Sequence, residues 1–149
     1  MTTNEQQVSV SREIRASPEE IFDVLADPRQ HPAIDGSGSV RGVVSGPDRL
    51  EMGSKFGMSM KIGLPYRIKS TVVEFDENRR IAWAHFGKHR WRYELEPFDD
   101  GARTRVTETF DYSTARSPWL IEKLGYPKKH PANMDATLER LAAHVENSD

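Results

Sequence analysis

The sequence contains no cysteine among its 149 residues. Disulfides, thiolate metal ligands and a cysteine nucleophile are therefore excluded together, and a reducing, cytoplasmic location is the expectation. Long hydrophobic runs are also missing, since no stretch approaches the ~20 apolar residues that span a bilayer. The polar segment Met1–Gln7 lacks the apolar run of a signal peptide. We expect no stable membrane insertion, and disorder over residues 1–6.

An excess of either charge is absent as well, because 21 basic residues face 23 acidic ones. No global field attracts nucleic acid. Basic clusters do occur at Arg79-Arg80, Lys88–Arg92 and Lys128–His130. These clusters either bind RNA or an anionic lipid head group or, in the plainer interpretation, are solvated strand ends. The plainer interpretation predicts no nucleic-acid partner.

Strong local signatures of nucleotide, zinc and serine-hydrolase chemistry are missing too. The chain has no glycine-rich phosphate loop, no His-Glu-x-x-His and no nucleophile elbow. We therefore expect no cofactor and no metal.

The N-terminal quarter predicts a strand followed by two short helices. Val8, Val10 and Ile14 alternate with polar residues, which is the period of a half-buried strand. Ser17 before Pro18 is a helix N-cap signal, and Asp27-Pro28 ends that helix. A second short helical turn is predicted at about 29–34.

Six further strands are predicted before residue 114. They lie near 39–45, 54–62, 66–76, 79–86, 89–96 and 102–113. The turns between the last five include Gly63-Leu64-Pro65, Asp76-Glu77-Asn78, Gly87-Lys88 and Asp99-Asp100-Gly101, which are too short for crossover helices. The strands therefore form an antiparallel meander.

The C-terminal segment has a helical pattern. It begins after Ser117-Pro118, pauses at Gly125-Tyr126-Pro127 and at Pro131, and resumes from about Ala132. Its predicted apolar face consists of Met134, Leu138, Leu141, Ala142 and Val145. We predict one α+β domain over residues 1–149, in which a curved antiparallel sheet of six to seven strands wraps around this long helix.

Three segments carry a resemblance to a known family. They are Ile14–Phe22 with Leu25 and Asp27-Pro28, then Trp83 with Trp91–Glu96, and Thr104–Thr109. In these the chain resembles the START-like (SRPBCC) superfamily, and within it the bacterial polyketide cyclase/dehydrase and lipid transport family. The resemblance implies a helix-grip fold with a hydrophobic cavity between sheet and final helix. Members use it for lipids, sterols, polyketides, plant hormones or protein contacts, so the fold selects no single function.

The register between the strands at 79–86 and 89–96 decides which side chains face that cavity. A two-residue turn pairs Ala84 with Trp91, whereas an odd-length or bulged connection pairs Trp83 with Trp91 and Ile81 with Tyr93. We favour the second, because it brings the large apolar residues onto one face. The predicted cavity residues are Met58, Met60, Trp83, His85, Trp91, Tyr93, Glu108, Phe110, Tyr112, Met134, Leu138 and Leu141.

Two of these residues are candidates for chemistry. Glu108 shares the inward parity of Phe110, so it is either a cavity acid and ligand anchor or a strand-edge residue paired with a basic neighbour at the rim. His85 is either a base or, more ordinarily, a hydrogen-bonded histidine. The other four histidines are interpreted as surface or loop residues. Met58 and Met60 form a soft lining or ordinary core.

Three functions are compatible with this pattern. The leading one is non-catalytic binding or transport of a lipid- or polyketide-like hydrophobic molecule by a monomer or homodimer, oriented by Glu108, His85, Tyr93 and Tyr112. An aromatase/cyclase or dehydratase with Glu108 or His85 as proton carriers is the second. A protein-interaction module is the third.

Overall fold

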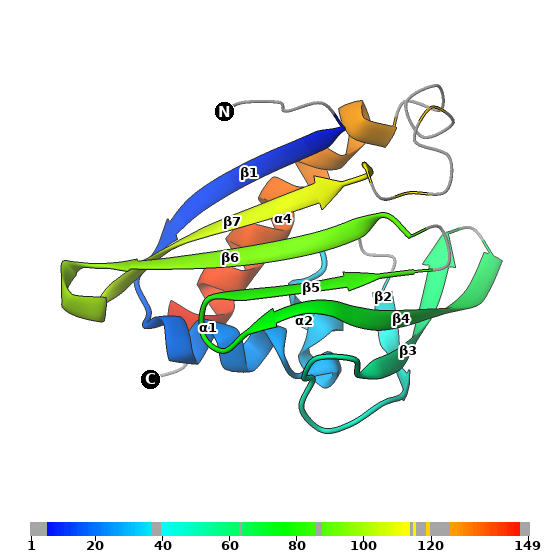
Figure 1. Cartoon of the computed structure of the whole chain (residues 1–149), viewed down its shortest axis with the longest axis horizontal. Coiled ribbons are helices and arrows are strands. Elements are labelled where there is room, and N and C mark those ends of the chain that lie inside the picture. The colour runs from blue at the N-terminus through cyan, green and yellow to red at the C-terminus, as the bar shows by residue number, and fades with distance from the viewer. Residues whose placement is uncertain are drawn as a thin grey trace.

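Seven strands form one antiparallel sheet in the part of the chain that the computed structural model describes, which is residues 6–36, 40–62, 64–85, 88–113, 115, 119 and 126–146 (Figure 1). The strands are β1 (Gln7–Ile14), β2 (Val40–Ser45), β3 (Lys55–Ile62), β4 (Leu64–Asp76), β5 (Arg80–Ala84), β6 (Arg90–Phe98) and β7 (Arg103–Asp111). Their order in the sheet is β1-β7-β6-β5-β4-β3-β2. The predicted meander is confirmed, and β1 pairs with its last strand.

Short helices follow β1, as predicted. The helical elements are α1 (Pro18–Leu25), η1 (Pro28–Gln30), α2 (His31–Ile34), η2 (Asp99–Gly101) and α4 (Tyr126–Glu146). The Ser17 side chain accepts a hydrogen bond from the Glu20 amide at 3.2 Å, which satisfies one of the free donors of the first turn of α1. The α1 residues Ile21, Phe22 and Leu25 are fully buried.

Helix α4 crosses one face of the sheet, and α1 and α2 lie at one end of the same face (Figure 1). The predicted apolar face is confirmed, because Met134, Leu138, Leu141, Ala142 and Val145 are all buried. The predicted pause at Pro131 is wrong, since α4 runs through it. A proline removes one backbone donor, and we attribute the continuous helix to the packing of that buried face. The helical turn predicted after Ser117-Pro118 lies largely outside the described residues.

The turn predicted at Gly63-Leu64-Pro65 also differs from the structure. Leu64 and Pro65 already belong to β4, opposite Ile62 and Lys61 of β3. Proline is tolerated there because β5 pairs with β4 only from Thr71 onward, so no neighbouring strand needs a hydrogen bond on that side.

The first residues of the chain were expected to be disordered. Residues 1–5 lie outside the described part. Gln6 has a defined place, because its carbonyl accepts a hydrogen bond from the Tyr112 amide at 2.9 Å.

Candidate functional site

The inner face of the sheet, which α4 covers, carries its largest side chains in two rows. Trp83, Trp91 and Phe110 lie opposite one another on β5, β6 and β7. Ile81, Tyr93 and Glu108 form the next row. Ala84 pairs with Arg90, so five residues connect β5 and β6. The favoured odd-length register is confirmed.

Glu108 is an acid in the interior. It is only 3 % exposed, and its Oε1 has no hydrogen-bond partner in the structure. Burial raises the pKa of the Glu108 carboxyl to about 8, while a hydrogen bond from Tyr93 acts in the opposite direction and the negative charges of Asp35 and Asp135 add to the rise. The rim interpretation of Glu108 is therefore wrong, and the group is a neutral carboxylic acid over most of the pH range below 8.

Tyr93 is the hydrogen-bonding neighbour of this acid on the adjacent strand. Its hydroxyl is hydrogen-bonded to Glu108, and burial together with the Glu108 charge raises the pKa of Tyr93 well above its ordinary value. Both groups are therefore neutral near pH 7. Together they form a polar point on a face that is otherwise lined by Ile81, Leu95 and Val106.

His85 lies beyond Trp83 on the same face, half-buried. Its Nδ1 is 2.7 Å from the Ser70 hydroxyl on β4. Burial, assisted by the nearby His89, lowers the pKa of His85 to about 4. His85 is thus a neutral, hydrogen-bonded histidine, which agrees with the more ordinary of the two interpretations.

Three histidines expected at the surface or in loops contact the inner-face aromatics. His31 is 6 % exposed, and its Nε2 donates a 2.8 Å hydrogen bond to the Leu25 carbonyl. Its ring stacks on Trp83 at a centroid distance of 4.8 Å. The surface interpretation of His31 is therefore wrong. Its position in a four-residue helix between prolines gave no periodicity from which burial would follow.

His89 and His130 extend the aromatic cluster toward the start of α4. The His130 ring is 4.5 Å from Phe110 and 5.0 Å from Trp91, between centroids. The His89 ring lies 5.4 Å from Phe110, and its Nδ1 is buried without a hydrogen-bond partner. His130 reaches Phe110 through the packing of α4, and His89 reaches it through the pairing of β6 with β7, so no local pattern indicated either contact. The fourth histidine expected at the surface or in a loop, His144, is exposed.

The predicted methionine and leucine residues divide between two clusters. Met58, Leu138 and Leu141 are buried in the larger one, and Met60 packs against it while half-buried. Met134 joins Phe110 and Tyr112 in the smaller one. The smaller cluster thus extends the inner face beyond Glu108.

Exposure varies along this face in an unusual way. Trp83 sits on β5, the middle strand of seven, and points inward, yet it is only half-buried. Trp91, His85 and His89 are half-buried as well, whereas Ile81, Tyr93 and Glu108 are buried. Solvent therefore reaches the aromatic part of the inner face beside a covered polar part.

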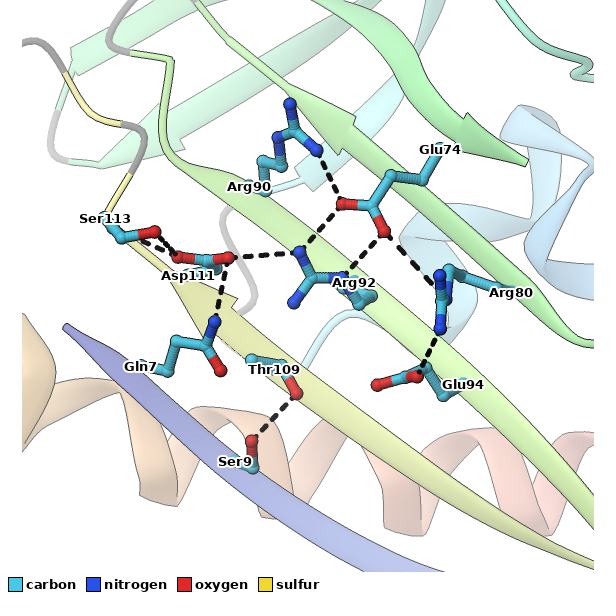
Figure 2. A network of polar contacts seen from close by, with 10 residues as sticks. All are labelled: Gln7, Ser9, Glu74, Arg80, Arg90, Arg92, Glu94, Thr109, Asp111 and Ser113. Carbon is cyan, nitrogen blue, oxygen red and sulfur yellow. Dashed lines mark hydrogen bonds and ion pairs between the residues drawn. The ribbon is translucent and has the colours of Figure 1, made fainter. Parts of the chain in front are cut away.

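The outer face is chemically different (Figure 2). Glu74 accepts hydrogen bonds from Arg90 and Arg92 at 2.7 Å, and Arg92 also reaches Asp111 at 3.0 Å. The two arginines hold the pKa of Glu74 at about 2. The basic cluster predicted at Lys88–Arg92 is therefore partly neutralised by carboxylates.

The residues that the structure describes hold neither a metal-binding cluster nor a membrane-spanning helix. Residues 6–36, 40–62, 64–85, 88–113, 115, 119 and 126–146 contain no group of three His, Asp or Glu side chains placed to hold a metal ion. In the same ranges no helix combines the length and the apolar character needed to cross a bilayer.

A curved antiparallel sheet gripping a C-terminal helix, with aromatic and neutral polar groups between them, defines a START-like helix-grip protein. Residues 5–146 match the family model described as polyketide cyclase / dehydrase and lipid transport. The chain belongs to this family.

Curated relatives and solved structures agree with that placement. The uncharacterized protein Rv0088 of Mycobacterium tuberculosis is 44 % identical over 141 residues, which cover 91 % of this chain and 62 % of that protein. The chain thus spans less than two thirds of the length of this relative. The crystal structure of protein Ms6760 from Mycobacterium smegmatis superposes with a TM-score of 0.72 at 19 % identity, over 97 % of this chain and 93 % of that one.

A second solved structure is the Aha1 dimer from Colwellia psychrerythraea. It superposes with a TM-score of 0.64 at 15 % identity, over 96 % of this chain and 98 % of that one. At these identities both structures support the fold alone.

Proposed function

We propose that this protein binds a hydrophobic, lipid- or polyketide-like molecule between the inner face of the sheet and α4, and that Glu108 orients it as a neutral hydrogen-bond donor. The observation that carries the proposal is the Glu108 carboxyl, buried with Oε1 unpartnered beside Tyr93. Leaving a buried polar atom unpaired costs about 1–3 kcal/mol, which a ligand oxygen would recover.

The half-buried aromatics supply the apolar part of the proposed site. Trp83 and Trp91 lie opposite each other with accessible surface, and the apolar surface of a ligand placed on them would be removed from water at roughly 25 cal/mol per Å². Glu108 is one row further along the sheet, opposite Tyr93 in the pairing of β6 with β7 and diagonal to Trp91. A ligand in this position has an apolar body and a polar end.

The chemistry of that polar end follows from the charges around Glu108. Asp35 and Asp135 place negative charge near the carboxyl, which disfavours an anionic ligand group. A protonated carboxyl donates, so its partner is a neutral acceptor such as a ketone, ester or hydroxyl oxygen. The proposed ligand therefore carries uncharged oxygen.

Native mass spectrometry of the purified protein, followed by solvent extraction, tests whether such a molecule is bound. A defined apolar ligand is the expected result. The protein should also distinguish fluorenone from fluorene, its counterpart without the carbonyl, by roughly fivefold in affinity, the value of one hydrogen bond. Quenching of the fluorescence of Trp83 and Trp91 reports the binding.

Two substitutions at Glu108 separate a neutral donor from a charged partner. Glu108→Gln keeps a donor and should keep the preference for fluorenone at every pH, whereas the parent protein should lose it as pH rises through about 8. Glu108→Met should abolish the preference for fluorenone. Glu96 is an exposed glutamate on β6, the strand of Tyr93, so the control Glu96→Gln should leave the preference unchanged. Equal affinity for both probes in the parent protein would contradict the proposal, and an empty protein indifferent to both would favour a partner-binding module.

Catalysis at the same site is the second candidate. A carboxyl with a pKa of about 8 is suited to give and take protons near neutral pH, as a polyketide cyclase or dehydratase requires. Conversion of the extracted ligand into a product by the parent protein, with loss of turnover but not of binding in Glu108→Gln, would distinguish catalysis from carriage.

A further inference from the structure

The β3–β4 hairpin differs in composition from the rest of the chain. Between Glu51 and Glu74 there are four basic residues and no acidic one, in a chain whose net charge is −2. The basic residues are Lys55, Lys61, Arg67 and Lys69, and all four are exposed. No carboxylate of the described residues forms an ion pair with any of them, although most arginines of the other strands are paired.

The register of the hairpin places these charges together. Lys61 pairs with Pro65, Ser59 with Arg67 and Gly57 with Lys69, so the cations share one face of the two strands. The opposite face carries Met60 opposite Tyr66, with Leu64 at the start of β4. The hairpin is thus basic on one side and apolar on the other.

The apolar residues at the tip are exposed. Leu64 is 79 % exposed and Tyr66 is 40 % exposed, and both lie in the part of β4 that has no β5 partner. The tip lies at the edge of the molecule (Figure 1). Exposed leucine and tyrosine beside unpaired cations are the composition of an element that lies at a membrane–water interface, where tyrosine is enriched.

We propose that the tip of the β3–β4 hairpin docks onto an anionic lipid surface, with Leu64 and Tyr66 entering the interface and Lys61 and Arg67 contacting head groups. At about 3.3 Å per residue Arg67 lies roughly 10 Å from Leu64, close to one Debye length at physiological salt. Lys69 lies roughly 17 Å away and contributes less. The charge complementarity and the apolar tip together select a bilayer over a purely ionic partner.

Flotation with vesicles tests the electrostatic part. The protein should bind vesicles of equal parts phosphatidylcholine and phosphatidylglycerol, should not bind phosphatidylcholine alone, and should bind more weakly as salt rises. Lys61→Gln with Arg67→Gln should weaken binding roughly thirtyfold. The control pair Arg12→Gln with Arg79→Gln removes the same charge from exposed positions outside the hairpin and should leave binding unchanged.

A second pair of variants tests the apolar part. Leu64→Ser with Tyr66→Ser should weaken vesicle binding by roughly tenfold or more, because both side chains lose contact with the interface. Met52 is an apolar residue outside the hairpin whose exposure of 64 % lies between those of Tyr66 and Leu64, so Met52→Ser is the matched control and should bind normally. Thermal unfolding of every variant should match the parent, since all these side chains are exposed.

Several outcomes would overturn the inference. Equal losses in the hairpin and control variants would show that only net charge matters. Tighter binding to single-stranded RNA than to anionic vesicles, or self-association that the hairpin variants abolish, would assign the hairpin to another partner. Binding of fluorenone is measured without vesicles, so docking and ligand binding can fail independently.

Discussion

Glu108 links the proton concentration to folding. Its carboxyl has an ordinary pKa of 4.5 and a folded-state pKa of about 8, because burial disfavours its charge. Below pH 4.5 the carboxyl is protonated in both the folded and the unfolded state, so it does not affect the free energy of unfolding. Between 4.5 and about 8 the unfolded chain ionises first, so stability falls as pH rises, by about 5 kcal/mol across the whole interval.

A single substitution tests this linkage. Glu108→Gln should remove the fall, so that the variant gains stability relative to the parent as pH rises from 5 to 8, by several kcal/mol at the upper end. Urea unfolding at a series of pH values measures the difference. Parallel pH profiles for the two proteins would show that Glu108 is ionised or hydrated in the folded state.

At the scale of elements, the approach of α2 to α4 depends on a residue without a side chain. A Cβ on Gly36, which follows α2, would lie 2.5 Å from the Asn133 carbonyl oxygen and 2.5 Å from the Thr137 amide nitrogen. The Gly36 amide also donates to the Thr137 hydroxyl at 2.8 Å. Both obstacles are helix backbone, so the two segments must separate to admit a methyl group.

Gly36→Ala should therefore destabilise the protein by about 1–3 kcal/mol, the usual effect of overpacking. Gly42→Ala on β2 is the control, because nothing lies within 4 Å of its added Cβ. Chemical denaturation measures both. Equal stability of the two variants would mean that α2 shifts freely along α4.

Across the whole molecule, the outer-face network joins strands that are distant in sequence (Figure 2). Arg92 on β6 contacts Glu74 on β4 and Asp111 on β7, and Asp111 accepts a hydrogen bond from Gln7 on β1 at 3.1 Å. The network thus crosses the sheet from β4 to β1 on the side opposite α4.

Arg92→Met should reduce the free energy of unfolding by about 1–3 kcal/mol at neutral pH, since two charged partners lose hydrogen bonds. The pKa of Glu74 is lowered to about 2, so its contribution is present above 4.5 and lost as pH falls toward 2. The variant should accordingly show a weaker loss of stability in acid. Arg80→Met removes a half-exposed arginine paired with Glu94 and should change stability by less than about 1 kcal/mol.

Much of the fold follows from local patterns. Alternation in β1, the Ser17-Pro18 cap and the apolar face of α4 are short-range properties, and the structure confirms all three. The pause predicted at Pro131 is wrong because the packing that keeps α4 continuous is not a local property. The turn predicted at Pro65 is wrong because a proline is tolerated in β4 only where β5 does not pair with it, and that depends on the sheet.

The candidate site divides in the same way. Strand parity put Glu108 and Phe110 on one face, because side chains alternate with a period of two. Trp91 joined that face through the register that brings the large apolar residues together. Other features depend on which distant segments pack together. They are the hydrogen bond from Tyr93 to Glu108, the stacking of His31 on Trp83, and the absence of a carboxylate beside Lys61 among the described residues. The amino-acid sequence therefore determines which side chains share a face of a strand. Burial and ion pairing depend on all neighbours in space, so only the tertiary structure decides the pKa of Glu108 and leaves the hairpin cations without carboxylate partners among the described residues.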